Sequence, residues 1–368
     1  MKTFSTRLKF LLFNILTCFL VFSGAAQHRL VLLHPTVSNI ESMVWMLENK
    51  IIDIPGVELT GVYSAAEAYD YKKSEEYIRN HHLNYYNLRR VNEEIKPGQI
   101  FEENSCTPVF RELFEKSDAI LFFGGPDIPS SIYGEKQNLL TVVTDPNRHY
   151  FETSFFFHLI GGSRNPSFRP FLSDKPGFII RGFCLGMQTM NVAAGGTLIQ
   201  DIPSECYHIN TLEDAESLPV SSKHRSSQSP FYPLADLFDG VFHPIKLSED
   251  GYLKQIASQS AAVSPLVMSV HHQAVGKMGA NLKVIATSED AKIIEGLQHG
   301  TFKNVVGVQF HPESPSLYQK EVKFSPTPGN TFSPNELLTN SNSLNFHKTF
   351  WSDFSAKVLK STRLQSDK

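Results

Sequence analysis

The stretch RGFCLGMQTMNVAAGGTLIQDIP, residues 181–203, holds a cysteine, Cys184, between two glycines, Gly182 and Gly186. The apolar run before Cys184 predicts a buried strand, and the run 185–196 predicts a helix that a pair of glycines ends. Gly-x-Cys-x-Gly on a strand, a turn and a helix is the pattern of a nucleophile elbow. Taken alone, the pattern fits a buried, inert cysteine equally well, so other parts of the chain have to decide.

An elbow of this kind favours a reactive thiol at Cys184. Its glycines let neighbouring backbone approach without a side-chain clash. The helix that follows points its N-terminus at the sulfur, and the unpaired N–H groups and dipole there favour the thiolate over the thiol. The N–H of Leu185 can then face the oxyanion of an acyl intermediate.

A second motif lies near the C-terminus, where VVGVQFHPES (305–314) predicts a strand followed by His311, Pro312 and Glu313. A thiolate nucleophile works with a general base and with a group that orients the base. His311 is the natural base, and the carboxylate of Glu313 can hold its imidazole in the working tautomer. A plain surface turn is the alternative for His-Pro-Glu, and the upstream cysteine elbow makes it the weaker one.

Strands and helices alternate along the first half of the chain, which predicts an α/β fold with a mostly parallel sheet covered on both faces. Ligands of such sheets bind beyond the carboxyl ends of the strands, where Gly124-Gly125 and Cys184 stand out. Short connections in the second half predict an antiparallel extension. The predicted strands are 29–35, 57–64, 83–91, 118–126, 177–184, 241–247, 266–274, 282–288, 293–299 and 305–311, and the predicted helices are 39–51, 65–81, 108–117, 149–161, 185–196 and 345–361.

Residues 314–343 are rich in Ser, Pro, Asn and Thr and have little periodicity, which predicts a long loop within a single domain over 27–368. Because this loop starts directly after Glu313, we hypothesise that it shapes or covers the substrate cleft. A solvated surface loop is the alternative.

Residues 1–26 have the three parts of a secretory signal peptide: a basic start, an apolar run over 10–22 and small residues up to Ala26. The apolar run is short for a membrane span, and an uncleaved anchor is the alternative. Cleavage near Ala26 predicts an exported protein, periplasmic or secreted, with no membrane attachment. The formal net charge of −3 and the lack of a basic block argue against a nucleic-acid partner.

Three cysteines follow the predicted signal: Cys106, Cys184 and Cys206. An exported compartment permits disulfides, and a bridge between Cys106 and Cys206 would leave Cys184 free. Two further free thiols are the alternative. The sequence has no His-Glu-x-x-His or Cys-x-x-Cys spacing, which argues against a metal site, and we expect no cofactor.

The motifs GFCLGMQ, NVAAGGTLIQDI, SVHHQAV and GVQFHPE occur together and in order. The chain resembles the class I glutamine amidotransferase-like superfamily over most of 118–313. Within it, the chain looks like the γ-glutamyl hydrolase branch, which includes the γ-glutamyl-γ-aminobutyrate hydrolases. The resemblance implies a flavodoxin-like three-layer sandwich and a catalytic triad of Cys184, His311 and Glu313.

The resemblance also implies further site residues. The N–H groups of Leu185 and of Gly125, in the FFGGP loop, would form the oxyanion hole, and Gln188 would contact the glutamyl end of the substrate. In SVHHQAV, strand alternation lets one histidine face the site; the resemblance favours His272, and a histidine packed under the sheet is the alternative. A histidine follows Arg148 where many relatives have aspartate, so Arg148 binds a substrate carboxylate or, as we favour, forms a structural salt bridge.

Three functions remain open on this evidence. The first is an exported γ-glutamyl hydrolase that acts on a small-molecule γ-glutamyl amide. The second is a glutaminase subunit that supplies ammonia to a synthase, which the signal peptide argues against. The third is a catalytically silent binding protein on the same scaffold, which the presence of all three triad candidates argues against. The sequence does not set the oligomeric state, and a homo-oligomer is compatible with all three.

Overall fold

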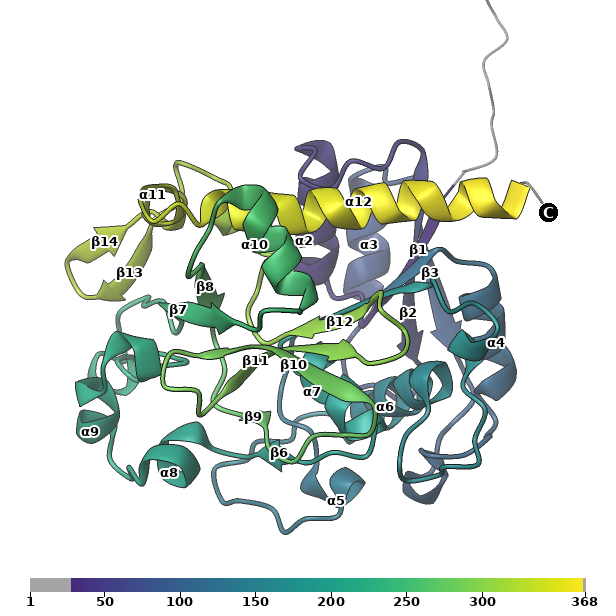
Figure 1. Ribbon diagram of the computed structural model, residues 1–368, viewed down its shortest axis with the longest axis horizontal. Helices are drawn as coiled ribbons and strands as arrows, with labels where there is room; N and C mark the ends of the chain where they lie inside the picture. The colour runs from purple at the N-terminus through teal and green to yellow at the C-terminus, as the bar shows by residue number, and fades with distance from the viewer. Residues whose placement is uncertain (1–27, 367–368) are drawn as a thin grey trace, which may run out of the picture.

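A ten-stranded sheet lies at the centre of the computed structural model, which describes residues 28–366 (Figure 1). The predicted signal peptide, 1–26, lies outside the described residues. From one edge to the other, the strands are β3 (Tyr86–Val91), β2 (Val57–Ser64), β1 (His28–Leu33), β4 (Ala119–Phe122), β5 (Ile179–Phe183), β12 (Val305–Val308), β11 (Ile294–His299), β10 (Leu282–Ser288), β7 (Val241–Leu247) and β8 (Leu266–Ser269).

The pairing changes direction at β12. The strands from β3 to β12 pair in parallel, and those from β12 to β8 pair antiparallel. The prediction of a mostly parallel sheet with an antiparallel extension is therefore confirmed.

Helices cover both faces of the sheet, which explains why its central strands are buried along their whole length. β4, with the sequence AILF, and β5 are buried at every residue. The result is the three-layer α/β sandwich that was predicted. One face packs against α2 (Val37–Glu48), α3 (Lys72–Asn80), α10 (Tyr252–Ser260) and α12 (Leu344–Ser366), and the other against α4 (Thr107–Glu115), α6 (Pro146–Ile160) and α7 (Leu185–Ala193) (Figure 1).

Smaller elements lie on the α7 side of the sheet in Figure 1. They are α5 (Ser130–Tyr133), β6 (Leu198–Ile199), α8 (Ile202–Tyr207), α9 (Leu212–Ser217) and β9 (Ala274–Val275). The single strand predicted over 266–274 is wrong, because this stretch forms β8 and β9. β8 pairs with β7 in the main sheet, whereas β9 pairs with β6, so the chain leaves the sheet between them, at the two histidines of SVHHQAV.

The prediction that 314–343 is a long loop is also wrong, because much of it forms a hairpin and a short helix. The hairpin strands are β13 (Phe324–Thr327) and β14 (Asn330–Phe332), and α11 (Pro334–Asn340) follows. Gly329 turns the hairpin at φ 80°, and the Ser333 side chain caps α11 by accepting a hydrogen bond from the Glu336 N–H. Elements this short have too few residues to show a period in the sequence.

The hairpin packs at the edge of the main sheet that β7 and β8 form (Figure 1). Phe324 stacks on Phe238 with ring centroids 4.1 Å apart, and Phe332 meets Phe242 edge to face at 5.7 Å. Leu338 of α11 is buried in the same cluster. These contacts tie 314–343 to the antiparallel extension.

The three cysteines of the described residues, Cys106, Cys184 and Cys206, are free thiols. The structure therefore decides for free thiols over a Cys106–Cys206 bridge. Burial raises the pKa of the Cys106 thiol to about 12, which makes it a packing residue. No helix within 28–366 has the length and apolar character needed to cross a membrane.

We expect Gly186→Ala to lower the free energy of unfolding by about 1–3 kcal/mol, the usual cost of overpacking. A Cβ at Gly186 would overlap the backbone oxygen of Phe122 on β4, and backbone cannot easily shift inside the sheet. Urea denaturation measures the loss. Gly177→Ala is the control, because a Cβ there meets nothing within 4 Å. Equal stability of the two variants would contradict this explanation.

Candidate active site

Cys184 lies at the turn between β5 and α7, with φ 49° and ψ −105°. A positive φ at a residue other than glycine is strained, and such strain collects at functional sites. The turn is fixed on two sides. The Cys184 N–H donates to the Val308 carbonyl at 2.8 Å, and a Cβ on Gly182 would lie 2.7 Å from the carbonyl carbon of Gly186. The strand, turn and helix predicted around Cys184 are all present.

His311 and Glu313 follow β12, the strand next to β5. The His311 N–H donates to the Met268 carbonyl at 3.1 Å, and its Nδ1 lies 2.8 Å from Glu313 Oε1. His311 also hydrogen-bonds the Cys184 side chain. Burial opposes charge on the imidazole, but the Glu313 carboxylate and the Cys184 thiolate together raise the pKa of His311 well above its ordinary value. The arrangement therefore favours the protonated form of His311.

The turn that carries His311 and Glu313 is held by two aromatic side chains. Trp351 Nε1 of α12 and the Tyr318 hydroxyl both donate to the Pro312 carbonyl, each at 2.8 Å. Sequence reasoning missed both residues, because neither belongs to a catalytic motif. Their effect is to fix the chain between His311 and Glu313.

The glycine pair after β4 lies directly beside the elbow. A Cβ on Gly124 would lie 2.9 Å from His311 Cε1, and a Cβ on Gly125 would lie 2.9 Å from Leu185 Cδ2. The fold thus brings the two predicted oxyanion residues, Gly125 and Leu185, together. Within 28–366, no acceptor takes a hydrogen bond from the N–H of either residue. Their role as oxyanion donors stays a prediction.

Comparison with known proteins agrees with this geometry. Residues 61–313 match the family model of peptidase C26. The chain belongs to the peptidase C26 family. Membership confirms the resemblance to the class I glutamine amidotransferase-like superfamily and indicates a hydrolase or amidotransferase-type function.

Two relatives and one solved structure are similar to this chain at low sequence identity. The glutamine amidotransferase-like protein RP404 of Rickettsia prowazekii is 29% identical over 220 residues, which are 55% of this chain and 72% of the relative. The glutamine amidotransferase-like protein YvdE of Lactococcus lactis is 28% identical over 196 residues, 53% of this chain and 66% of the relative. The solved structure of a GMP synthase component from Thermoplasma acidophilum matches 84% of this chain and 98% of its own at a TM-score of 0.38 and 11% identity.

In this peptidase C26 chain, Arg148 lies beneath the glycine loop. Its Nε is 2.7 Å from Glu152 Oε1, and both side chains are buried. Its Nη2 donates to the Gly124 carbonyl at 3.0 Å and to the Phe123 carbonyl at 3.3 Å. The favoured alternative, a structural salt bridge, is confirmed. The guanidinium also fixes the loop that presents the Gly125 N–H.

Gln188 is buried on α7, one turn after Cys184. Its amide nitrogen donates to the Gln273 carbonyl at 3.1 Å. The contact predicted between Gln188 and the glutamyl end of the substrate stays a prediction, since the side chain already has a protein partner.

The two histidines of SVHHQAV point in different directions. His272 Nε2 lies 3.0 Å from Asp127 Oδ2, and its Nδ1 lies 3.2 Å from Asp201 Oδ1. Burial opposes charge on His272, but these two carboxylates raise its pKa to about 9. His271 faces the interior, where burial lowers its pKa to about 3. His271 and His272 both line the same pocket, so the choice of His272 as the substrate-facing residue stays a prediction.

That pocket has a volume of about 600 Å³, and its lining includes Pro126, the residue after Gly125, but not Cys184, His311 or Gly125 themselves. Asp127, Asp201 and His272 form one polar side, and Lys223 and Arg225 also line the pocket. No residue of 314–343 lines it, so the structure gives the lid hypothesis no support. Much of the lining comes from 203–230, which follows the NVAAGGTLIQDI motif and in which sequence reasoning found no motif. Its apolar lining includes Leu140, Val142, Ile202, Ile209, Leu212 and Leu218.

We expect Arg148→Met to lower both stability and kcat. It leaves the buried Glu152 carboxylate unpaired, which costs about 3–5 kcal/mol of unfolding free energy, and it removes both hydrogen bonds to the glycine loop. The double variant Arg148→Met/Glu152→Leu should recover most of the stability, because an apolar pair replaces a buried ion pair at little cost. Its kcat should stay at least about tenfold low, as expected when a positioning contact is lost. Recovery of both quantities would assign Arg148 a purely structural role.

Proposed function

We propose that this protein is an exported γ-glutamyl hydrolase that cleaves γ-glutamyl amide bonds. One observation carries the proposal. His311, oriented by Glu313, hydrogen-bonds Cys184 at a strained elbow beside two N–H groups with no acceptor among the described residues. This arrangement suits acyl transfer to a thiol, and the resemblance of the motifs supports a γ-glutamyl acyl group.

The reaction follows from the positions of these groups. The Cys184 sulfur attacks the γ-carbonyl carbon, and the N–H groups of Gly125 and Leu185 stabilise the oxyanion that forms. Protonated His311 gives its proton to the nitrogen of the leaving amine as the C–N bond breaks. Neutral His311 then takes a proton from water, whose oxygen attacks the thioester, and the Cys184 thiolate leaves. Glu313 holds the imidazole in place throughout.

The pocket supports a leaving group larger than ammonia. Its lining includes Pro126, the residue after Gly125, its volume is about 600 Å³, and most of its lining surface is apolar. A glutaminase releases only ammonia and has no use for such a space. We therefore favour an apolar amine, amino acid or peptide as the leaving group, with protonated His272 on the polar side of the pocket.

The first test is release of free glutamate from a panel of γ-glutamyl amides that includes γ-glutamyl-leucine and L-glutamine. We expect kcat/KM for γ-glutamyl-leucine to exceed that for L-glutamine by at least about tenfold, since burying an apolar side chain contributes this much. Cys184→Ala should lose activity by at least about a thousandfold, and Cys206→Ala serves as the matched thiol control.

Two outcomes would contradict the proposal. Cleavage of L-glutamine alone would favour a glutaminase. No turnover of any substrate by a folded protein whose Cys184 thiol is free would favour a binding protein.

Export is the second part of the proposal, and the N-terminal sequence supports it. We expect the mature protein to begin at Gln27, because small residues up to Ala26 precede it. N-terminal sequencing of protein from the exporting cell and its medium measures this. A mature protein that still begins at Met1 and stays inside the cell would overturn this part and leave the chemistry untouched.

A further inference from the structure

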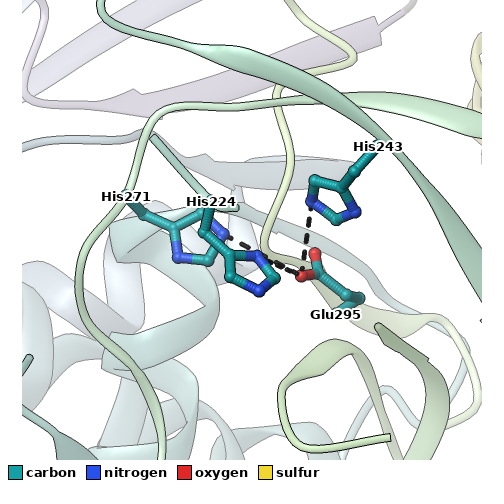
Figure 2. Close-up of side chains that lie close together, drawn as sticks. All are labelled: His224, His243, His271 and Glu295. Carbon is teal, nitrogen blue, oxygen red and sulfur yellow. Dashed lines mark ion pairs between the residues drawn. The ribbon is translucent and has the colours of Figure 1, made fainter. Parts of the chain in front are cut away.

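Three histidines and one glutamate from separate parts of the chain meet inside the protein: His224, His243, His271 and Glu295. Their nearest nitrogen and oxygen atoms lie within 4.8 Å of one another, and each side chain is at most 2% exposed. Figure 2 shows the three imidazoles directed at one end of the Glu295 carboxylate. We call these four residues the histidine cluster.

Four separate segments of the chain supply the histidine cluster. His224 follows a short 3-10 turn, Val220–Ser222, His243 lies on β7, His271 follows β8, and Glu295 lies on β11. The three nitrogens nearest to Glu295 Oε1 are His224 Nδ1 at 3.1 Å, His243 Nε2 at 3.7 Å and His271 Nε2 at 3.9 Å.

Backbone carbonyls fix the tautomers of two of these imidazoles. His271 Nδ1 bonds the Gln273 carbonyl at 2.8 Å, and His243 Nδ1 bonds the Pro244 carbonyl at 3.1 Å. A carbonyl only accepts, so both Nδ1 atoms carry a hydrogen, and in the neutral imidazoles both Nε2 atoms then carry a lone pair. These lone pairs therefore face an oxygen that also has only lone pairs to offer. Metal-binding histidines are commonly oriented by this type of bond to a carbonyl.

Most of the other polar atoms of the histidine cluster lack hydrogen-bond partners. Within 28–366, both oxygens of Glu295, both ring nitrogens of His224 and Nε2 of His271 have no hydrogen bond. Nε2 of His243 bonds the rotatable Ser269 hydroxyl at 2.7 Å. A buried carboxylate without a hydrogen bond is strongly unfavourable, and a cation at the centre of the cluster would satisfy the carboxylate and the lone pairs at once.

We propose that the histidine cluster binds one divalent transition-metal ion, Zn²⁺. Imidazole nitrogens with one carboxylate oxygen suit zinc, whereas calcium and magnesium prefer oxygen ligands alone. A tetrahedral zinc with bonds of about 2.0–2.1 Å separates its ligand atoms by about 3.3 Å. The three separations from Glu295 Oε1 bracket this value. A buried zinc ion with four protein ligands has no open coordination position, which is typical of a structural site.

A metal bound here would stabilise the positions of the active-site residues. This inference does not depend on the proposed substrate. The Glu295 carbonyl accepts the Gln309 N–H at 2.9 Å, two residues before His311. His224 and His271 also lie along the pocket, and the His271 N–H donates to the His224 carbonyl at 3.0 Å. The metal would thus hold the pocket wall against the strands that lead to His311.

The test is metal content and metal-dependent stability of the mature protein, purified without chelators or a histidine tag. Mass spectrometry of the metals should find about one zinc per chain. Removal of the metal with a chelator should lower Tm by at least about 5 °C, and one equivalent of Zn²⁺ should restore it. Co²⁺ in place of zinc should give the intense visible absorption of a four-coordinate ion.

Two variants and a control locate the ion. Glu295→Gln and the double variant His224→Gln/His271→Gln should each reduce zinc content at least about tenfold. His347→Gln should keep it, because His347 is a buried histidine outside the cluster whose Nε2 bonds the Leu266 carbonyl. If a variant does not fold, the Co²⁺ spectrum and the zinc-dependent Tm of the wild-type protein still show whether the protein binds a four-coordinate metal ion.

Two results would overturn the proposal. One is a folded wild-type protein that takes up no Zn²⁺ or Co²⁺ and whose Tm does not respond to either ion. The other is a folded double variant that binds as much zinc as the wild-type protein, which would place the ion elsewhere. Neither result depends on hydrolase activity, so the metal site and the proposed function can fail separately.

Discussion

Cys184 can point out of the sheet only because the backbone beneath it is packed without side chains. Gly182 lets the first turn of α7 lie against β5, and Gly186 lets the same turn lie against the Phe122 carbonyl of β4. The Val308 carbonyl of β12 accepts the Cys184 N–H. Three adjacent parallel strands therefore hold one strained residue, and a local sequence could not keep this conformation without them.

The remaining parts of the site depend on this arrangement. β12 lies next to β5, so the chain after it brings His311 to the sulfur, while β4 on the other side brings Gly125 to Leu185. Each neighbour is stabilised separately. The Pro312 carbonyl accepts hydrogen bonds from Trp351 and Tyr318, and Arg148 holds the glycine loop from below. The reacting groups are thus preorganised by contacts that do not touch them.

Charge in this region is buried in pairs. Arg148 lies against Glu152, and His272 lies between Asp127 and Asp201. The histidine cluster differs from these pairs, because its carboxylate faces three imidazoles without a hydrogen bond. The cluster lies between the pocket wall and β12, so the stability of the antiparallel extension affects the shape of the active site.

The sequence by itself determined the features that depend on near neighbours. Apolar runs specified the central strands, paired glycines marked the elbow at Cys184, and the Pro312 turn joined His311 to Glu313. Periodicity failed at β13, β14 and α11, which are too short to show it.

Only the tertiary structure decided what is built from distant segments. It placed Arg148 under the glycine loop and lined a pocket with residues of 201–230. It also brought together the histidine cluster from four segments, whose spacing in the sequence matches no metal-ligand motif. Local patterns reflect backbone preferences and the burial of one face, whereas these sites depend on which strands become neighbours in the sheet.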